Sequence, residues 1–121
     1  MRRYTDRFGY CDIDRRKYFY HWTDRSNIPA LRERGLVPMG PHGTTAWSRW
    51  RDGSTEPRVY LTAYPEMWEW RVHEETGVLL RVRRHDVRAH KGDYESEWFS
   101  RETVPPNKIA RCNFGRGWMK L

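Results

Sequence analysis

The hydrophobic positions of this chain fall in short runs, which predicts short strands and small helices rather than long elements. One aromatic run covers residues 18–22, and its composition favours a strand. Asp24 or Ser26 can then cap a helix of about two turns over residues 27–34. Gly35 stands where the C-terminal stop of that helix is expected.

The rest of the chain alternates between turn-rich and apolar segments. The expected elements are a strand over residues 58–62, a short helix from 65 to about 72, a buried strand over 78–82, a strand at 98–99 after Glu97, and a last strand that begins near 109. Residues 86–93 are polar and are expected to form a loop. Short strands with small helices near the front of the chain predict an α+β fold.

Residues 38–58 are rich in Gly, Pro, Ser, Thr and Trp, which predicts a long irregular loop. Loops of this length are uncommon in compact domains unless they are functional, so we expect this one to face a ligand. Trp47 and Trp50 either cover a site there or anchor the loop.

Length and charge narrow the class of protein. The chain has 121 residues, which fits one domain. Its formal net charge is +7, so we expect an anionic partner, either a nucleic acid or a phosphate-bearing cofactor. Residues 1–17 are both basic and aromatic and are typical of an arm that tracks phosphates and stacks on bases. A solvated basic surface without a specific partner, and an N-terminal segment that packs on the body, are the alternatives.

The two cysteines, Cys11 and Cys112, lie near opposite ends of the chain and show no zinc-binding spacing. Whether they form a disulfide stays open at this stage. No apolar run approaches the roughly 20 residues that cross a bilayer, and the basic start is followed by no signal-peptide core. We therefore expect a soluble cytoplasmic protein that does not contact a membrane.

Three motifs occur in order between residues 18 and 110. The first is Tyr20-His21-Trp22-Thr23 with Asn27-Ile28 and Gly35-Leu36 behind it, the second is Val59-Tyr60-Leu61-Thr62, and the third is Glu95-Ser96-Glu97-Trp98-Phe99 followed by Val104-Pro105-Pro106 and Ile109. Together they resemble the ADP-ribosyltransferase superfamily, and they are most like the DarT-type DNA ADP-ribosyltransferases. The first motif of those enzymes also runs tyrosine, histidine, any residue, threonine before an Asn-Leu helix. The resemblance implies a split β-sandwich of short strands with small helices.

The resemblance also implies NAD as a co-substrate, without a metal. In that superfamily the first-strand histidine hydrogen-bonds a ribose hydroxyl of NAD, and the backbone beside it receives the nicotinamide carboxamide. His21 and Trp22 take these positions in this sequence. An imidazole suits the role because one ring nitrogen can be fixed by the protein while the other meets a hydroxyl. Thr23 and Asn27 are expected to line the same cofactor site.

Two further residues are expected to act on the nicotinamide-ribose bond. Tyr60 would stack on nicotinamide, because an aromatic face is a good partner for a planar cation. Ordinary core packing of Tyr60 is the alternative, and Tyr64, Trp68 and Trp70 are rivals for the stacking position. Glu97 is the expected catalytic carboxylate, since cleavage builds positive charge on the sugar that a carboxylate stabilises.

The acceptor of the ADP-ribose is less clear from the sequence. Glu95 precedes Glu97 by two residues, so on an extended strand both would point to one face. Family members that modify arginine carry a glutamate at the earlier position, where it engages the acceptor guanidinium. Arg83 and Arg84 are further candidate acceptor contacts. A nucleic acid acceptor is favoured by the basic charge, and a protein acceptor is the alternative.

Two other functions remain open at the sequence level. An RNA 2'-phosphotransferase would also use NAD. Its pattern requires a second histidine where this chain has Tyr60, although Arg81, Arg83 and Arg84 could bind a phosphate. A non-enzymatic nucleic-acid-binding module would rely on the basic arm, on Trp47 and Trp50, and on the Arg83-Arg84 edge. Its binding would weaken steeply with salt and would be indifferent to Glu97.

Overall fold

The structure is a computed structural model that describes residues 11–38, 56–113 and 116–121. The strands in this part of the chain are β1 (Tyr18–Asp24), β2 (Val59–Thr62), β3 (Gly77–Arg83), β4 (Ala89–Lys91), β5 (Glu97–Ser100), β6 (Ile109–Asn113) and β7 (Gly117–Lys120). The helix α2 spans Ile28–Arg34, and the short 3-10 helices are η1 (Arg25–Asn27), η2 (Pro65–Met67), η3 (Glu69–Arg71), η4 (Arg84–Asp86) and η5 (Pro106–Lys108). This combination of strands and short helices confirms the expected α+β class.

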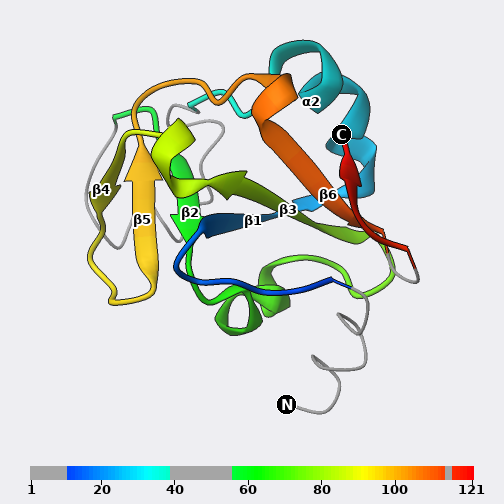
Figure 1. Ribbon diagram of the computed structural model, residues 1–121, viewed down its shortest axis with the longest axis horizontal. Coiled ribbons are helices and arrows are strands. Elements are labelled where there is room, and N and C mark those ends of the chain that lie inside the picture. Colours follow the sequence, from blue (N-terminus) through cyan, green and yellow to red (C-terminus); the bar gives the residue numbers. More distant parts are fainter. Residues whose placement is uncertain (1–10, 39–55, 114–115) are drawn as a thin grey trace.

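The strands form one antiparallel sheet in the order β4-β5-β2-β1-β3-β6-β7. β1 pairs with β3 along its whole length, from Tyr18 opposite Arg83 to Asp24 opposite Gly77. β1 and β2, in contrast, share the single pair of Tyr20 and Thr62. In Figure 1, β2 and β5 run steeply across the direction of β1 and β3. The sheet is therefore open between β1 and β2 beyond that pair.

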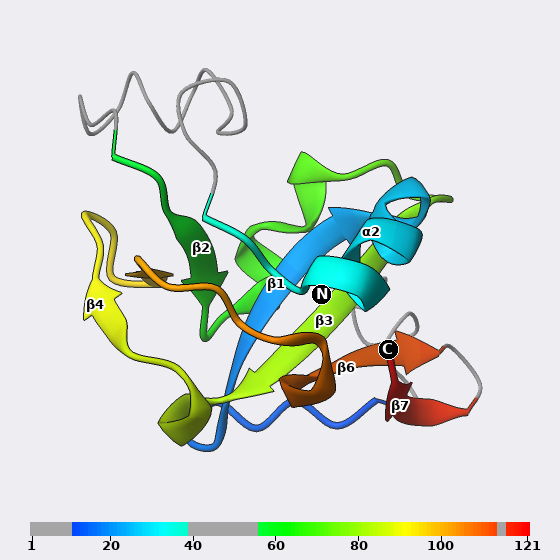
Figure 2. The same ribbon diagram turned by 90° about the horizontal axis from the view of Figure 1, so that it is seen from above.

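Both faces of the sheet are covered, because the side chains of β1 alternate between two hydrophobic clusters. Phe19 belongs to the larger cluster, with Leu80 and Val82 of β3 and with residues from α2. Tyr20 and Trp22 belong to the smaller cluster on the opposite face. Figure 2 shows α2 following the end of β1, and β2 standing on the side of β1 away from β3.

The expected cap at Asp24 belongs to the 3-10 turn η1 and not to α2, whose N-cap residue Asn27 makes no side-chain cap hydrogen bond. The side chain of Asp24 accepts a hydrogen bond from the Ser26 backbone N–H at 2.9 Å and another from the Thr76 hydroxyl at 2.6 Å. The Thr76 bond, followed by those from Ser26, lowers the pKa of Asp24 to about 2. Gly35 ends the helix with φ of 78°, and a Cβ there would lie 2.0 Å from the carbonyl oxygen of Val104. Only glycine fits at this stop.

Three element predictions were wrong. Residues 65–72 form two separate 3-10 turns in place of one short helix. Residues 86–93 contain β4, which pairs with β5 at the edge of the sheet although its three residues show no apolar alternation. The strand after residue 109 is followed by β7, which completes a hairpin. The ligand-facing loop expected at 38–58, with Trp47 and Trp50, lies mostly outside the described residues, as do the first ten residues of the arm.

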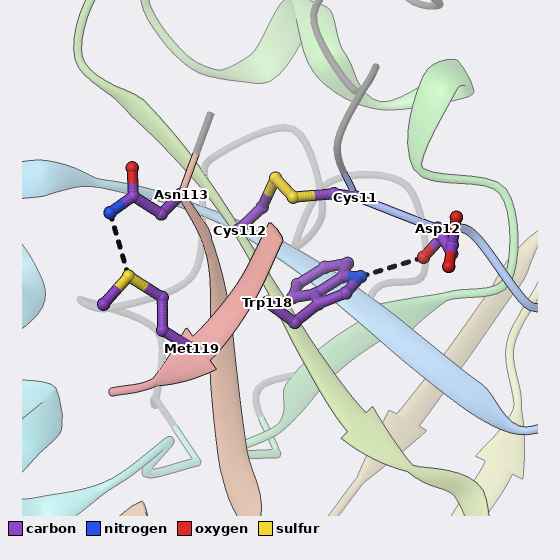
Figure 3. The surroundings of a disulfide bond; sticks show 6 residues. All are labelled: Cys11, Asp12, Cys112, Asn113, Trp118 and Met119. Atoms are coloured by element: carbon purple, nitrogen blue, oxygen red, sulfur yellow. Dashed lines mark hydrogen bonds between the residues drawn. A yellow bond between two sulfur atoms is a disulfide. The ribbon is translucent and has the colours of Figure 1, made fainter. Parts of the chain in front are cut away.

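A disulfide joins Cys11 to Cys112 of β6, with 6.0 Å between their Cα atoms (Figure 3). Beside it, the Trp118 indole N–H donates to the carbonyl oxygen of Asp12 at 2.9 Å. The described part of the expected arm, residues 11–17, is thus fixed to the sheet rather than free. Disulfides are rare in the reducing cytosol, so this bond argues against the expected cytoplasmic location. Within the described ranges, no helix is long and apolar enough to cross a membrane.

The disulfide connects residues 101 positions apart, so breaking it should cost substantial stability. A cross-link over a loop of about 100 residues stabilises a fold by about 4.7 kcal/mol in the chain-entropy model, by restricting the unfolded chain. We expect reduction, or the pair of changes Cys11→Ser and Cys112→Ser, to lower the free energy of unfolding by that order in urea denaturation. An unchanged unfolding midpoint would show that the bond does not form in solution.

Candidate functional site

A cavity of about 570 Å³ occupies the opening between β1 and β2. Its walls are the second half of β1, the strand β2, the inner side of α2, and residues of the 68–72 segment. The residues expected at a cofactor site meet here, and they are His21, Trp22, Thr23, Asn27, Tyr60 and Glu97. The cavity lies within the 300–1,000 Å³ range usual for small-molecule sites.

His21 bridges the opening. Its Nδ1 lies 2.7 Å from the backbone carbonyl oxygen of Tyr60. Because a carbonyl can only accept, Nδ1 carries the proton and Nε2 of the neutral ring is left as an acceptor. Burial lowers the pKa of His21, the Tyr60 carbonyl opposes this, and the charge of Arg71 lowers it further. A neutral imidazole at pH 7 therefore offers an acceptor for a hydroxyl group.

The side chains around His21 are engaged in holding the walls. The Asn27 amide donates to the Thr23 hydroxyl oxygen at 3.0 Å, which ties the start of α2 to β1. The Trp22 indole N–H donates to the carbonyl oxygen of Pro65 at 2.8 Å and ties the 65–72 segment to the same strand. These three side chains line the cavity and also fix its shape.

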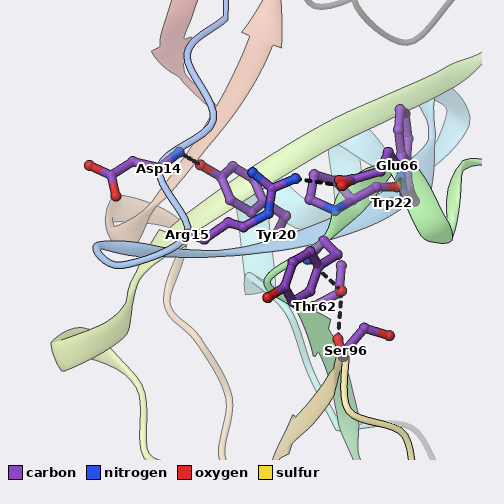
Figure 4. Close-up of polar contacts among 9 residues, drawn as sticks. Asp14, Arg15, Tyr20, Trp22, Thr62, Glu66 and Ser96 are labelled. Carbon is purple, nitrogen blue, oxygen red and sulfur yellow. Dashed lines mark hydrogen bonds and ion pairs between the residues drawn. The ribbon is translucent and has the colours of Figure 1, made fainter. Parts of the chain in front are cut away.

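Glu97 begins β5 on the opposite side of the opening and is only 5% exposed. One carboxylate oxygen accepts the backbone N–H of Asp93 at 3.1 Å. Thr62, its partner across the strand pair, donates to the Ser96 carbonyl oxygen at 2.6 Å (Figure 4), and the Trp68 indole N–H donates to the Ser96 hydroxyl at 3.1 Å. The turn that carries Glu97 is thus held by two neighbouring segments.

Gly92 is the residue that leaves room for this carboxylate. A Cβ on Gly92 would lie 2.3 Å from one carboxylate oxygen of Glu97. The Gly92 N–H also donates to the Glu97 carbonyl oxygen at 2.9 Å. The backbone of the β4–β5 hairpin therefore packs directly on the Glu97 side chain.

The expected acceptor residues do not line the cavity. Glu95 lies exposed in the turn before β5, so the expectation that it shares one strand face with Glu97 was wrong. The turn forms because the Glu97 N–H donates to the Tyr94 carbonyl oxygen at 3.0 Å. Arg83 is exposed at the far end of β3, opposite Tyr18.

Arg84 is used in packing. Its guanidinium lies over the rings of Phe19 and Trp98, at 4.3 and 5.3 Å from their centroids. This position is on the larger hydrophobic cluster, at the end of β3 that lies away from the cavity. Arg83 and Arg84 therefore do not join the cavity-lining residues.

Sequence reasoning missed the segment that braces the cavity wall. The backbone N–H of Asp14 donates to the Tyr20 hydroxyl at 2.7 Å, and Arg15 pairs with Glu66 at 2.5 Å (Figure 4). The Arg15 guanidinium also lies 4.8 Å from the centroid of the Tyr64 ring. No spacing signals such contacts, because Arg15 and Glu66 are 51 positions apart. The segment 11–17 thus links the disulfide to the wall that Trp22 also holds.

Among the described residues no group of three or more His, Cys, Asp and Glu side chains could hold a metal ion. Comparisons of the chain with protein-family models, with curated proteins and with solved structures found no match.

The lowered pKa of His21 makes a prediction about acid stability. Its pKa is lower folded than unfolded, so the unfolded chain binds the extra proton and stability falls as pH drops through the unfolded value near 6.5. We expect wild type to lose more stability than His21→Asn between pH 7.5 and 5.5, measured by urea denaturation at each pH. Parallel pH dependences in the two proteins would contradict a lowered pKa of His21.

The contact of Gly92 with Glu97 predicts a specific steric coupling. Gly92→Ala should destabilise the fold by about 1–3 kcal/mol, the usual cost of overpacking, because the added methyl displaces the carboxylate. In the Glu97→Ala background the same change should cost much less, since the clashing atoms are gone. The double-mutant cycle measures this difference by denaturation, and additive effects would contradict the contact.

Proposed function

We propose that this protein is an NAD-dependent mono-ADP-ribosyltransferase that transfers ADP-ribose to a macromolecule. One observation carries the proposal: His21, Tyr60 and Glu97, which come from three different strands, line a single cavity. The three residues are separated by 39 and 37 positions in the chain, so their convergence is a property of the fold. We further propose that the opening between β1 and β2 is the split of an ADP-ribosyltransferase-like β-sandwich.

The chemistry fits a site with one buried carboxylate. The bond between C1' of the ribose and the nicotinamide nitrogen breaks, and nicotinamide leaves as a neutral molecule with the bonding electron pair. Positive charge grows on C1' and the ring oxygen of the sugar, where Glu97 stabilises it. The acceptor nucleophile then bonds C1' and gives up its proton. The leaving group needs no general acid.

The other cavity residues suit the parts of NAD. Nε2 of His21 accepts a hydrogen bond from a ribose hydroxyl, because Nδ1 donates its own hydrogen bond to the Tyr60 carbonyl oxygen. Tyr60 provides an aromatic side chain on the cavity wall for the nicotinamide ring. The backbone at Trp22 receives the carboxamide, and Thr23 and Asn27 complete the wall beside it. Glu97 faces the same cavity from β5.

The alternatives have weaker support. An RNA 2'-phosphotransferase needs arginines free for a phosphate, yet the Arg81 guanidinium lies between the rings of Tyr18 and Trp118, at 4.1 and 4.5 Å from their centroids. A nucleic-acid-binding module without activity would not need a buried carboxylate in a cavity. The net charge of +7 supports a nucleic acid acceptor, and a protein acceptor is the other possibility.

The proposal predicts that Glu97→Gln reduces nicotinamide release from NAD by at least about a hundredfold, the scale found when a transition-state charge contact is removed. Gln keeps the size of the side chain, so a thermal melt should show a folded protein. The assay follows nicotinamide by chromatography with DNA, RNA and protein acceptors in parallel.

Glu102→Gln is the matched control, because Glu102 is exposed in the turn after β5 and does not line the cavity. It should release nicotinamide at the wild-type rate. Absence of nicotinamide release by wild type with every acceptor would reject the enzyme proposal. Release that Glu97→Gln leaves intact would reject the role of Glu97.

A further inference from the structure

The disulfide is the first link in a set of contacts that reaches the cavity wall. Residues 11–17, which we name the strap, run from Cys11 to the start of β1, and Figure 3 shows the disulfide end. Cys11 is the one buried side chain of the strap, and it packs in the smaller hydrophobic cluster. Further along, the Asp14 backbone N–H donates to the hydroxyl of Tyr20, a residue that lines the cavity. The strap therefore joins the disulfide to β1 at the cavity.

The strap also holds the segment that follows β2. The Arg15 guanidinium donates to the Glu66 carboxylate at 2.5 Å (Figure 4). Glu66 belongs to η2, whose first residue, Pro65, accepts the Trp22 indole N–H at its carbonyl oxygen. Trp22 and the residue after η2, Trp68, both line the cavity. A displacement of η2 would thus move the cavity wall.

Release of the strap would leave the Glu66 carboxylate poorly solvated. Its side chain is 20% exposed, and its second oxygen, Oε1, is buried without a hydrogen-bond partner in the described part of the chain. A buried carboxylate that loses its cation is costly, and it regains water only if its surroundings move. Because Glu66 lies in η2, the segment that moves is the one beside the cavity.

The strap braces the cavity and does not block it. None of residues 11–17, all of which the structure describes, lines the cavity. Their contacts reach the wall through the Tyr20 hydroxyl and through Glu66. Freeing the strap therefore loosens the wall and does not clear an entrance, so the expected effect on a ligand is weaker binding.

We propose that the disulfide between Cys11 and Cys112 is a redox switch for the cavity. In the oxidised protein the strap fixes η2 and the cavity binds its ligand. After reduction the strap loosens, η2 moves, and the ligand binds more weakly. Redox changes act as switches where they bias an element with two arrangements, which here is η2 with the strap bound or released. The inference concerns regulation of the proposed NAD site and rests on the proposed function only for the choice of ligand.

The redox step has a single target and balances with a dithiol reductant. Cys11 and Cys112 are the two cysteines of the chain. A thiolate of the reductant attacks one sulfur, the S–S bond breaks, and the second thiol of the reductant then displaces the attacked cysteine from the mixed disulfide. Two electrons and two protons pass to the protein, giving two cysteine thiols and the disulfide form of the reductant. Both cysteines are buried, at 3% and 6% exposure, so reduction needs long incubation.

The switch makes the cavity competent in an oxidising compartment and weakens it in a reducing one. Isothermal titration of the full chain with NAD, and with ADP-ribose, which lacks the nicotinamide-ribose bond, compares the two states. We expect reduction with dithiothreitol to raise the Kd of both ligands by about fivefold or more, the lower end of usual coupling between two sites. The pair of changes Cys11→Ser and Cys112→Ser should bind like the reduced protein and should not respond to dithiothreitol.

Hydrogen exchange followed by mass spectrometry tests the wall without any ligand. At short labelling times, exchange through global unfolding is negligible and local opening is measured. Peptides that cover residues 64–72 should exchange about fivefold or more faster after reduction, because their turns lose the support of the strap. One of the bonds affected joins the Trp68 N–H to the Pro65 carbonyl oxygen at 3.1 Å. Peptides of β5 should change by less than about twofold, since β5 is held by its pairing with β2 and β4.

A variant that cuts the strap without touching the disulfide tests the same route. Arg15→Gln removes the charge that pairs with Glu66, so it should weaken NAD binding and speed exchange at residues 64–72 while the disulfide is intact. Reduction should then add less than it does in wild type, because the two changes act through one contact. Arg101→Gln is the matched control, since Arg101 also pairs with a glutamate, Glu56 at 2.8 Å, but does not line the cavity. It should keep wild-type affinity and the full response to reduction.

The outcomes separate this inference from the proposed function. Equal NAD affinity before and after reduction, with nicotinamide release intact, would overturn the switch and keep the enzyme. Exchange that rises equally in β5 and in residues 64–72, including unfolding of the whole reduced protein, would make the disulfide a general stabiliser and overturn the switch. Wild-type behaviour of Arg15→Gln would also overturn it. Selective loosening of residues 64–72, without NAD binding in either state, would support the redox-controlled wall and reject NAD as the ligand.

Discussion

The candidate site depends on the single pair of Tyr20 and Thr62 that joins β1 to β2. Continued pairing of these strands would close the space that the cavity occupies, whereas loss of the pair would divide the sheet. Both residues are anchored from outside the pair. The Tyr20 side chain is fully buried and its hydroxyl accepts from the Asp14 backbone, and the Thr62 hydroxyl donates to the Ser96 carbonyl oxygen. The same junction therefore fixes the opening and positions the turn before Glu97.

Residues 11–17 extend this junction to the disulfide. Cys11 is joined to β6, while Asp14 and Arg15 reach Tyr20 and the 64–66 segment. Because Trp22 bonds to Pro65 in that segment, the disulfide and the cavity wall belong to one connected set of contacts. A domain of this size gains much of its stability from burial. The cavity wall, in contrast, is held in place by specific bonds between segments that are distant in the sequence. The redox state of the protein should therefore affect the wall more than it affects β5.

Local signals in the sequence predicted the elements that local physics decides. The stop at Gly35 and the apolar run of β3 each act within a few residues, and each formed as expected, whereas Asp24 caps the turn η1 and not the expected helix. The convergence of His21, Tyr60 and Glu97 was predicted only through a family resemblance, since no local rule brings these strands together. The edge strand β4 and the bond between Thr62 and Ser96 were not predicted, because both depend on partners elsewhere in the chain. Glu95 was misplaced for the same reason: a turn, not a strand, precedes Glu97.

Charge is unevenly distributed over the described part of the chain. The chain is strongly basic, yet several of its arginines are engaged in stacking, as Arg81 and Arg84 are on aromatic rings. Arg58 pairs with Glu56 at 2.9 Å and lies 4.0 Å from the centroid of the Phe99 ring. Such guanidinium groups stabilise packing and are less available to a polyanion. Asp93, Glu95 and Glu97 stand within five positions of one another, so acidic side chains gather in the β4–β5 hairpin although the whole chain is basic.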